Sequence, residues 1–279
     1  MTTTIPVLQA GDPATRPVLV LHGGGGPRTV APIVGHLGAT RFATAPTHPG
    51  WDGTERPDSI ASVADLAHTY LDALVEHDER DVVVVGSSIG GWIALEMAVQ
   101  STTDERYAGR LGAVVVIDGV GAVVEGQPIA DFFALDARGL AEAAWHDPER
   151  GYQDPAASTD EQRAAQQANG RTMAAIAGTM SDPTLLGRLG AVQVPTLVVW
   201  GASDRIVTPA YGRAVAAAVP GAEFAEVAAA GHLPHLEAPE ATWAVIDPFV
   251  ARFAGAPTAG RSLLTGSTDG AAPGAEPTG

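Results

Sequence analysis

Cysteine and lysine are both absent from this chain, and all 16 of its basic residues are arginines. Without cysteine the chain has no disulfide, no thiolate metal site and no cysteine nucleophile. Without lysine it has neither a Schiff-base amine nor the lysine of a phosphate-binding loop. No apolar run approaches the ~18 residues that suggest a membrane-spanning helix.

A formal net charge of −16 argues against nucleic acid and against anionic membrane surfaces as partners. The apolar content of 46% over 279 residues is typical of one large globular domain, or of one domain with an insertion. Residues 1–6 lack the basic and apolar segments of a signal peptide, so we expect a cytoplasmic location. The sequence leaves open whether the chain forms a homo-oligomer.

The sequence is organised around four valines, residues 82–85, which lead into a Gly-x-Ser-x-Gly motif. The motif runs from Gly86 to Gly90 with Ser88 at its centre, and an apolar helical pattern follows. A buried strand, a sharp turn that carries a serine and a helix form a nucleophile elbow. We therefore expect the Ser88 hydroxyl to stand clear of the sheet, and the N–H of Ile89 to face a developing oxyanion.

Strand-like apolar runs alternate with helical patterns along most of the chain. The runs cover residues 17–21, 42–45, 82–85, 113–117, 196–200 and 224–227, and a short edge strand is predicted at 5–8. This alternation predicts an α/β fold with a mostly parallel central sheet flanked by helices. Sites in such folds lie beyond the carboxyl ends of the strands. Four polar residues follow strand ends and should share one edge: His22, Ser88, Asp118 and Asp204.

The alternation breaks between residues 120 and 189, where helices are predicted at 128–133, 139–145 and 160–178 with no strand. We interpret residues 120–189 as a helical cap inserted into a core made of residues 1–119 and 190–254. A surface excursion without a functional role is the alternative. Residues 255–279 are mostly Gly, Ala, Pro, Ser and Thr, which predicts a disordered low-complexity tail.

An acid and a histidine follow the last two core strands. Asp204 ends the segment Gly-Ala-Ser-Asp after residues 196–200, and His232 lies in Gly-His-Leu-Pro-His-Leu-Glu after residues 224–227. The chain order serine, acid, histidine is that of a serine-nucleophile triad on this type of sheet. With the His-Gly-Gly segment that begins at His22 and the Ser88 motif, the chain resembles the α/β-hydrolase superfamily, specifically its single-domain members with a helical cap. The resemblance covers about residues 5–253.

This resemblance implies a serine hydrolase that needs no cofactor and no metal. Ser88 would be the nucleophile, His232 its general base, and Asp204 the group that orients and stabilises the imidazole. Backbone N–H groups of Ile89 and Gly24 would form the oxyanion hole, with Gly25 as the donor if the loop shifts. In this family, the histidine at the position of His22 is usually structural.

Each assignment has an alternative within the sequence. His235 competes with His232, Asp118 competes with Asp204, and Ser88 could be an ordinary turn serine. Asp118 could instead be a cap-hinge or turn residue, and His235 a supporting or surface residue. The glycine run at residues 23–26 could cradle a phosphate, but it lacks the Gly-Lys-Ser/Thr ending of such loops.

The first functional hypothesis is cleavage of an ester or related acyl bond in a small, largely apolar substrate. A carbon–carbon bond hydrolase of the ring-cleavage type, a lactonase and a cofactor-free perhydrolase would use the same triad. Outside this class, the chain could be a non-catalytic ligand-binding member of the fold or a lyase with an acid–base relay. Candidate pocket residues are Gly25, His48, Trp51, Trp92, Phe132, Phe133 and Trp145.

Overall fold

The computed structural model describes residues 6–131 and 133–253. A central sheet contains seven strands: β1 (Val7–Ala10), β2 (Pro17–Leu21), β3 (Phe42–Pro46), β4 (Val82–Ser87), β5 (Leu111–Ile117), β8 (Thr196–Gly201) and β9 (Glu223–Val227). Their order across the sheet is β1-β3-β2-β4-β5-β8-β9, and only β1 runs antiparallel to its neighbour. The predicted mostly parallel α/β sheet is confirmed.

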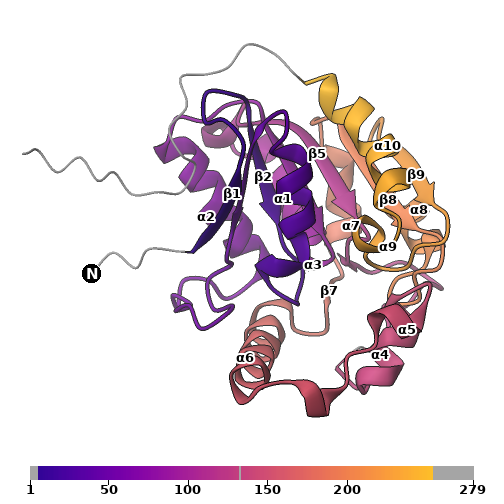
Figure 1. Ribbon diagram of the computed structural model, residues 1–279. Coiled ribbons are helices and arrows are strands. Elements are labelled where there is room, and N and C mark those ends of the chain that lie inside the picture. The colour runs from indigo at the N-terminus through magenta and orange to yellow at the C-terminus, as the bar shows by residue number, and fades with distance from the viewer. Residues whose placement is uncertain (1–5, 132, 254–279) are drawn as a thin grey trace, which may run out of the picture.

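Helices cover both faces of the sheet (Figure 1). One face carries α1 (Ala31–Leu37) and α10 (Pro239–Ala251), and the other α2 (Val63–Glu76), α3 (Ile89–Thr103) and α8 (Pro209–Ala218). Shorter elements are η1 (Pro27–Val30), η2 (Glu105–Tyr107) and α9 (Pro234–Glu237). Among the described residues, no helix is both long and apolar enough to cross a membrane.

The strands supply both cores because successive side chains of a strand point to opposite faces. In β4, Val82 and Val84 pack with α2 and α3, whereas Val83 and Val85 pack with α1 and α10. All four valines have no exposed surface. Burial on both faces explains why the strands read as continuous apolar runs.

The inserted segment, residues 120–189, leaves the sheet after β5 and returns to it at β8. It contains β6 (Gly121–Ala122), α4 (Ala137–Ala144), α5 (Pro148–Gly151), η3 (Pro155–Ala157), α6 (Asp160–Ala177), β7 (Ser181–Asp182) and α7 (Leu185–Arg188), and η4 (Leu189–Ala191) begins at its last residue. Figure 1 shows α4, α5 and α6 at the bottom of the view, apart from the layers around the sheet.

Two predictions within the inserted segment were wrong. Residues 128–131 form no helix, because the segment is drawn to the core instead: the N–H of Ala130 donates to the carbonyl of Ile206 at 2.8 Å. The two-residue strands β6 and β7 pair in parallel where no strand was predicted. Phe132 and the predicted tail at residues 255–279 lie outside the described residues.

Helix α2 begins at Val63. Its N-cap is Ser62, whose hydroxyl oxygen accepts a hydrogen bond from the N–H of Asp65 at 3.1 Å. The Asp65 carboxylate in turn accepts from the N–H of Ala61 at 3.1 Å. This local exchange satisfies one free N–H group of the first turn, that of Asp65, and ties the residue before the N-cap to the helix, which explains the boundary.

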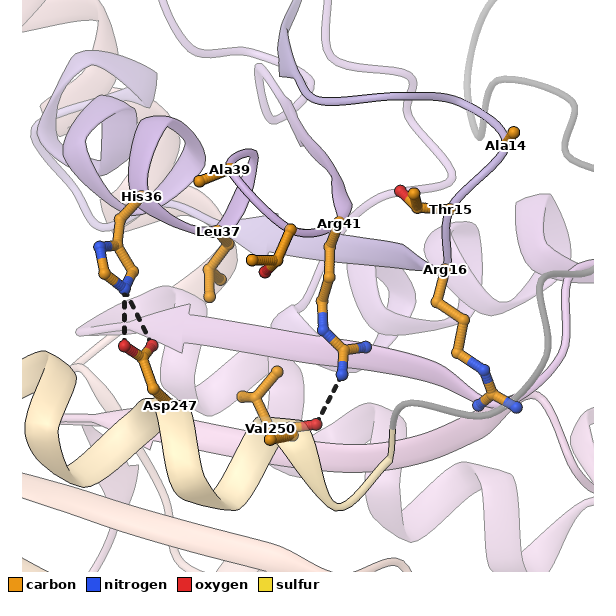
Figure 2. Close-up of a pocket in the computed structure, with 11 residues that line it drawn as sticks. Ala14, Thr15, Arg16, His36, Leu37, Ala39, Arg41, Asp247 and Val250 are labelled. Carbon is orange, nitrogen blue, oxygen red and sulfur yellow. Dashed lines mark hydrogen bonds and ion pairs between the residues drawn. The ribbon is translucent and has the colours of Figure 1, made fainter.

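A groove of about 600 Å³ lies between α1 and the C-terminal end of α10 (Figure 2), and Ser88, Asp204 and His232 are not among the residues that line it. Within it the buried guanidinium of Arg41 donates to the carbonyl of Val250 at 2.6 Å, and His36 bonds to Asp247 at 2.8 Å. A cation on the last carbonyls of a helix satisfies unpaired acceptors and opposes the negative end of the helix dipole. The two contacts hold α10 against α1 and against the residue that precedes β3.

The turn between β4 and α3 depends on a close approach of two backbone segments. A Cβ atom on Gly90 would lie 2.1 Å from the carbonyl oxygen of Leu21, on the neighbouring strand β2. No side chain fits at that distance, and both atoms belong to rigid elements. Glycine at this position therefore allows α3 to start directly against the end of β2.

We expect Gly90→Ala to lower the free energy of unfolding by about 3 kcal/mol, because the methyl group must push apart packed backbone. Gly170→Ala is the matched control, since a Cβ on Gly170 in α6 meets no atom within 4 Å. It should stabilise the chain by about 0.5–1 kcal/mol through helix propensity. Denaturant unfolding checks both values, and equal effects of the two substitutions would contradict this account.

Candidate active site

Ser88 sits in a strained turn at the junction of β4 and α3. Its backbone angles are φ 59° and ψ −121°, outside the regions that L-residues prefer. The N–H of Ser88 donates to the carbonyl of Ile117 at 2.9 Å, and its own carbonyl accepts from Gly91 at 2.9 Å. These bonds hold the turn, and they leave the serine side chain partly exposed beyond the carboxyl end of the sheet.

Three side chains that are distant in the sequence form one hydrogen-bonded chain. The hydroxyl of Ser88 lies 2.9 Å from Nε2 of His232, to which it donates. Nδ1 of the same imidazole lies 2.8 Å from Oδ2 of Asp204 and donates to it. The Asp204 side chain has no exposed surface, and its other oxygen accepts from the N–H groups of Ile206 and Val207 at 2.8 and 3.2 Å.

Two backbone N–H groups beside Ser88 are free to bind a ligand. Ile89 is the first residue of α3, and an N–H at this position has no partner within its own helix. The N–H of Gly24 has no hydrogen-bond partner within residues 6–131 and 133–253. Gly23 brings this loop against the serine, since a Cβ on Gly23 would lie 3.1 Å from the Cβ of Ser88.

Residues 18–245 match the family model described as the alpha/beta hydrolase family. The chain belongs to this family. The match covers more than half of the sequence, including Ser88, Asp204 and His232. It confirms the resemblance found in the sequence and the prediction of an enzyme with the α/β-hydrolase fold.

Solved structures of three hydrolytic enzymes share this fold. A thermophilic esterase from Thermogutta terrifontis gives a TM-score of 0.68 at 22% identity, over 90% of this chain and 94% of that one. Est816, an N-acyl homoserine lactone degrading enzyme, gives a TM-score of 0.68 at 21% identity, over 88% of this chain and 96% of that one. A 2-hydroxy-6-oxo-6-phenylhexa-2,4-dienoate hydrolase from Rhodococcus sp. strain RHA1 gives a TM-score of 0.63 at 24% identity, over 88% of this chain and 93% of that one. Identities this low establish the fold, not the substrate.

Buried side chains of this hydrolase hold the glycine loop, residues 23–26, in place. His22 has no exposed surface; its Nδ1 donates to the carbonyl of Gly23 at 2.7 Å, and its Nε2 accepts from the N–H of His48 at 3.0 Å. Burial lowers the pKa of His22 to about 4, so the ring is neutral at pH 7. Trp51 donates from Nε1 to the carbonyl of Gly24 at 3.1 Å. His22 is therefore structural, as the resemblance implied.

His48 does not line an open pocket, which corrects the sequence prediction. The residue has no exposed surface, its Nε2 donates to the carbonyl of His22 at 3.0 Å, and its Nδ1 accepts from the hydroxyl of Tyr70. Burial lowers the pKa of His48 well below its ordinary value, and the neighbouring His22 adds to this effect. His48 thus supports the glycine loop, and nothing in its position along the sequence distinguished that role from a pocket role.

The remaining pocket candidates differ in their surroundings. Trp92 is 4% exposed and presses on Gly121, whereas Trp145 is half-buried and packs over Gly151. Gly25 is exposed, and Trp51 is fully buried beneath the glycine loop. A pocket role for Gly25, Trp92 and Trp145 stays a prediction.

The inserted segment touches the core on two sides of Ser88, through residues that the sequence did not single out. Helix α6 carries Met173, whose sulfur would lie 2.7 Å from a Cβ on Gly24. Asn169 on the same helix accepts from the N–H of Asp52 at 2.8 Å. On the other side, the carbonyl of Ala144 accepts from the N–H of His232 at 2.7 Å. No periodicity could have revealed these contacts, because they depend on how the segment folds back.

Within residues 6–131 and 133–253, one group of acids and histidines is compact enough to hold a metal ion: Asp118, Asp204 and His232. One atom of each lies within 4.8 Å of the others. Both ring nitrogens of His232 are already bonded to Asp204 and Ser88. A metal ion would have to break that chain of hydrogen bonds, so we assign no metal role to the group.

The two competing residues of the sequence analysis are both buried. His235 is 1% exposed and donates from Nε2 to the carbonyl of Thr29, on η1, at 2.9 Å, so it is not a surface residue. Asp118 has no exposed surface, and its Oδ1 accepts from the N–H of Gly201 at 2.9 Å. Among the described residues His235 is not hydrogen-bonded to Ser88 and Asp118 is not hydrogen-bonded to His232, whereas His232 bonds to Ser88 and Asp204 bonds to His232.

Burial of His235 predicts a loss of stability in acid. Its pKa falls from 6.5 to about 4 because burial disfavours the charged ring. The unfolded chain therefore binds a proton that the folded chain does not, and stability decreases as the pH falls from about 6.5 towards 4. At pH 5 this histidine should cost about 2 kcal/mol relative to pH 7.5.

His235→Gln keeps an N–H that can donate to Thr29 but cannot titrate. We expect the free energy of unfolding of this variant to lose about 2 kcal/mol less than that of the parent between pH 7.5 and pH 5. His77→Gln, at the C-cap of α2, is the control. Denaturant unfolding at the two pH values measures the difference, and parallel curves for parent and His235→Gln would refute the assignment.

Proposed function

We propose that this chain is a serine hydrolase that cleaves an ester or a related acyl bond through an acyl-enzyme. The observation that carries the proposal is the continuous chain of hydrogen bonds from Ser88 through His232 to Asp204, at 2.9 and 2.8 Å. A serine hydroxyl is a weak nucleophile at neutral pH unless a base removes its proton. His232 is at the right distance to be that base.

In the proposed mechanism, the Ser88 oxygen attacks the carbonyl carbon of the substrate while His232 accepts the proton. Asp204 stabilises the imidazolium that forms and holds the ring in the correct tautomer. The N–H groups of Ile89 and Gly24 donate to the oxyanion. His232 then protonates the leaving group, and a water molecule activated by the same imidazole hydrolyses the acyl-enzyme.

The surroundings of Ser88 favour a small and largely apolar substrate. Met173 of α6 packs over Gly24, beside Ser88. A thioether above the proposed oxyanion site offers dispersion contacts and no strong hydrogen bond. Residues 120–189 act in this proposal as the cap that covers the site.

Lactone opening and carbon–carbon bond cleavage are the alternatives within the same chemistry. A lactone is a cyclic ester, and the two structural neighbours Est816 and the Rhodococcus hydrolase act on a lactone and on a dienoate, respectively. Initial rates with short p-nitrophenyl esters, lactones and vinylogous diketones separate the three. The proposal predicts the highest kcat/KM on the ester series.

Ser88→Ala should lower kcat for a p-nitrophenyl ester by about 10⁴-fold or more, because the nucleophile is lost. Ser87→Ala is a closely matched control: this neighbouring serine is 1% exposed, and its hydroxyl has no partner among the described residues. Its loss should change kcat less than about threefold, since a buried side chain away from the acyl group takes no part in the attack. Steady-state kinetics of both variants decides, and near-full activity of Ser88→Ala would exclude the proposal.

A further inference from the structure

Asp118 is a buried carboxyl group beside the proposed triad that the mechanism above does not use. It follows the end of β5, as Asp204 follows the end of β8. One oxygen of Asp118 lies within 4.8 Å of a carboxylate oxygen of Asp204 and of a ring nitrogen of His232. Neither aspartate side chain has solvent access: Asp118 has no exposed surface, and the Asp204 side chain has none.

Two carboxylates this close and this deeply buried cannot both be ionised, because their repulsion is not screened by water. The hydrogen-bond donors decide which one keeps the charge. Asp204 accepts from the N–H groups of Ile206 and Val207 and from His232, whereas Asp118 accepts only from the N–H of Gly201. Asp204 has more hydrogen-bond donors to stabilise a negative charge, so the proton belongs to Asp118.

The free oxygen of Asp118 is consistent with that proton. Oδ2 is buried and accepts no hydrogen bond from any described residue. An oxygen that carries a hydrogen needs an acceptor instead of a donor, and the nearby Asp204 carboxylate is one. Burial, followed by the charge of Asp204, raises the pKa of Asp118 well above its ordinary value, and Glu237 on α9 adds to the effect.

We propose that Asp118 is a positioning residue whose neutral carboxyl group anchors Gly201 through Oδ1 and donates its O–H from Oδ2 to Asp204. Asp118 thereby ties the ends of β5 and β8 together and fixes the carboxylate that orients His232. It also keeps a single negative charge beside the imidazole, which matches the single positive charge formed during attack. The role in catalysis rests on the proposed function, whereas the protonation state does not.

Asn is the informative substitution at this position. Its carbonyl can accept from Gly201 and its amide N–H can donate to Asp204, which reproduces a neutral carboxyl group. Asn also tolerates the backbone φ of 45° found at Asp118. Asp118→Gly tolerates that φ as well but removes both hydrogen bonds.

For p-nitrophenyl ester hydrolysis, Asp118→Asn should keep kcat/KM within about threefold and leave the acid-limb midpoint of its pH profile unchanged. Asp118→Gly should lower kcat by about 10- to 100-fold, with KM nearly constant, because the orienting group is lost. If Asp118 were ionised, Asp118→Asn would remove a charge near His232 and lower that midpoint by about 2 pH units. Such a shift, or a wild-type kcat in Asp118→Gly, overturns the proposal.

A second measurement needs no substrate and so separates this inference from the proposed function. Infrared difference spectra at pH 7 between the parent and Asp118→Asn should show the carbonyl stretch of a protonated carboxylic acid in the parent alone. The same band should persist in Ser88→Ala. A carboxylate signal in place of that band would overturn the inference even if ester hydrolysis is fully established. The band of the neutral acid would support the inference even if the ester substrate is wrong.

Discussion

The relay of hydrogen bonds from Ser88 to His232 to Asp204 depends on three strand ends meeting at one edge of the sheet. Ser88 follows β4, Asp204 follows β8, and His232 follows β9. The parallel pairing of β4, β5, β8 and β9 aligns those ends, and their apolar runs on both faces bury the strands that carry them. The chemistry of the site is therefore a consequence of sheet topology, because no two of the three residues are neighbours in the sequence.

Beside this relay, four buried polar side chains under the glycine loop are hydrogen-bonded. His22, His48, Tyr70 and Trp51 hold the glycine loop through hydrogen bonds to its backbone and to one another. Buried polar groups are costly unless each finds a partner, and a satisfied network fixes a single conformation. A rigid loop keeps the N–H of Gly24 aimed at one position, which is what stabilisation of a developing charge requires. The acid sensitivity expected of His235 is the thermodynamic cost of packing neutral histidines in the same region.

The sequence predicted the sheet and the proposed triad because each carries a strong local signal. Most of the core strands are short apolar runs, and each residue of the proposed triad follows a predicted strand: Ser88 follows residues 82–85, Asp204 follows 196–200 and His232 follows 224–227. The absence of a helix at residues 128–131 escaped prediction, since the hydrogen bond from Ala130 to Ile206 is a tertiary contact. The burial of His48, the position of Met173 over Gly24 and the closeness of Asp118 to Asp204 depend on tertiary packing, which no periodicity encodes.

The central claim, that Ser88 is an activated nucleophile, is tested most directly by covalent labelling with a fluorophosphonate followed by peptide mapping. A serine whose proton is accepted by His232 should react with one equivalent of the reagent, and the adduct should lie on Ser88. Labelling should disappear in His232→Ala, in which the serine itself is intact. An unlabelled protein, or an adduct on Ser87 or another serine, would contradict the account.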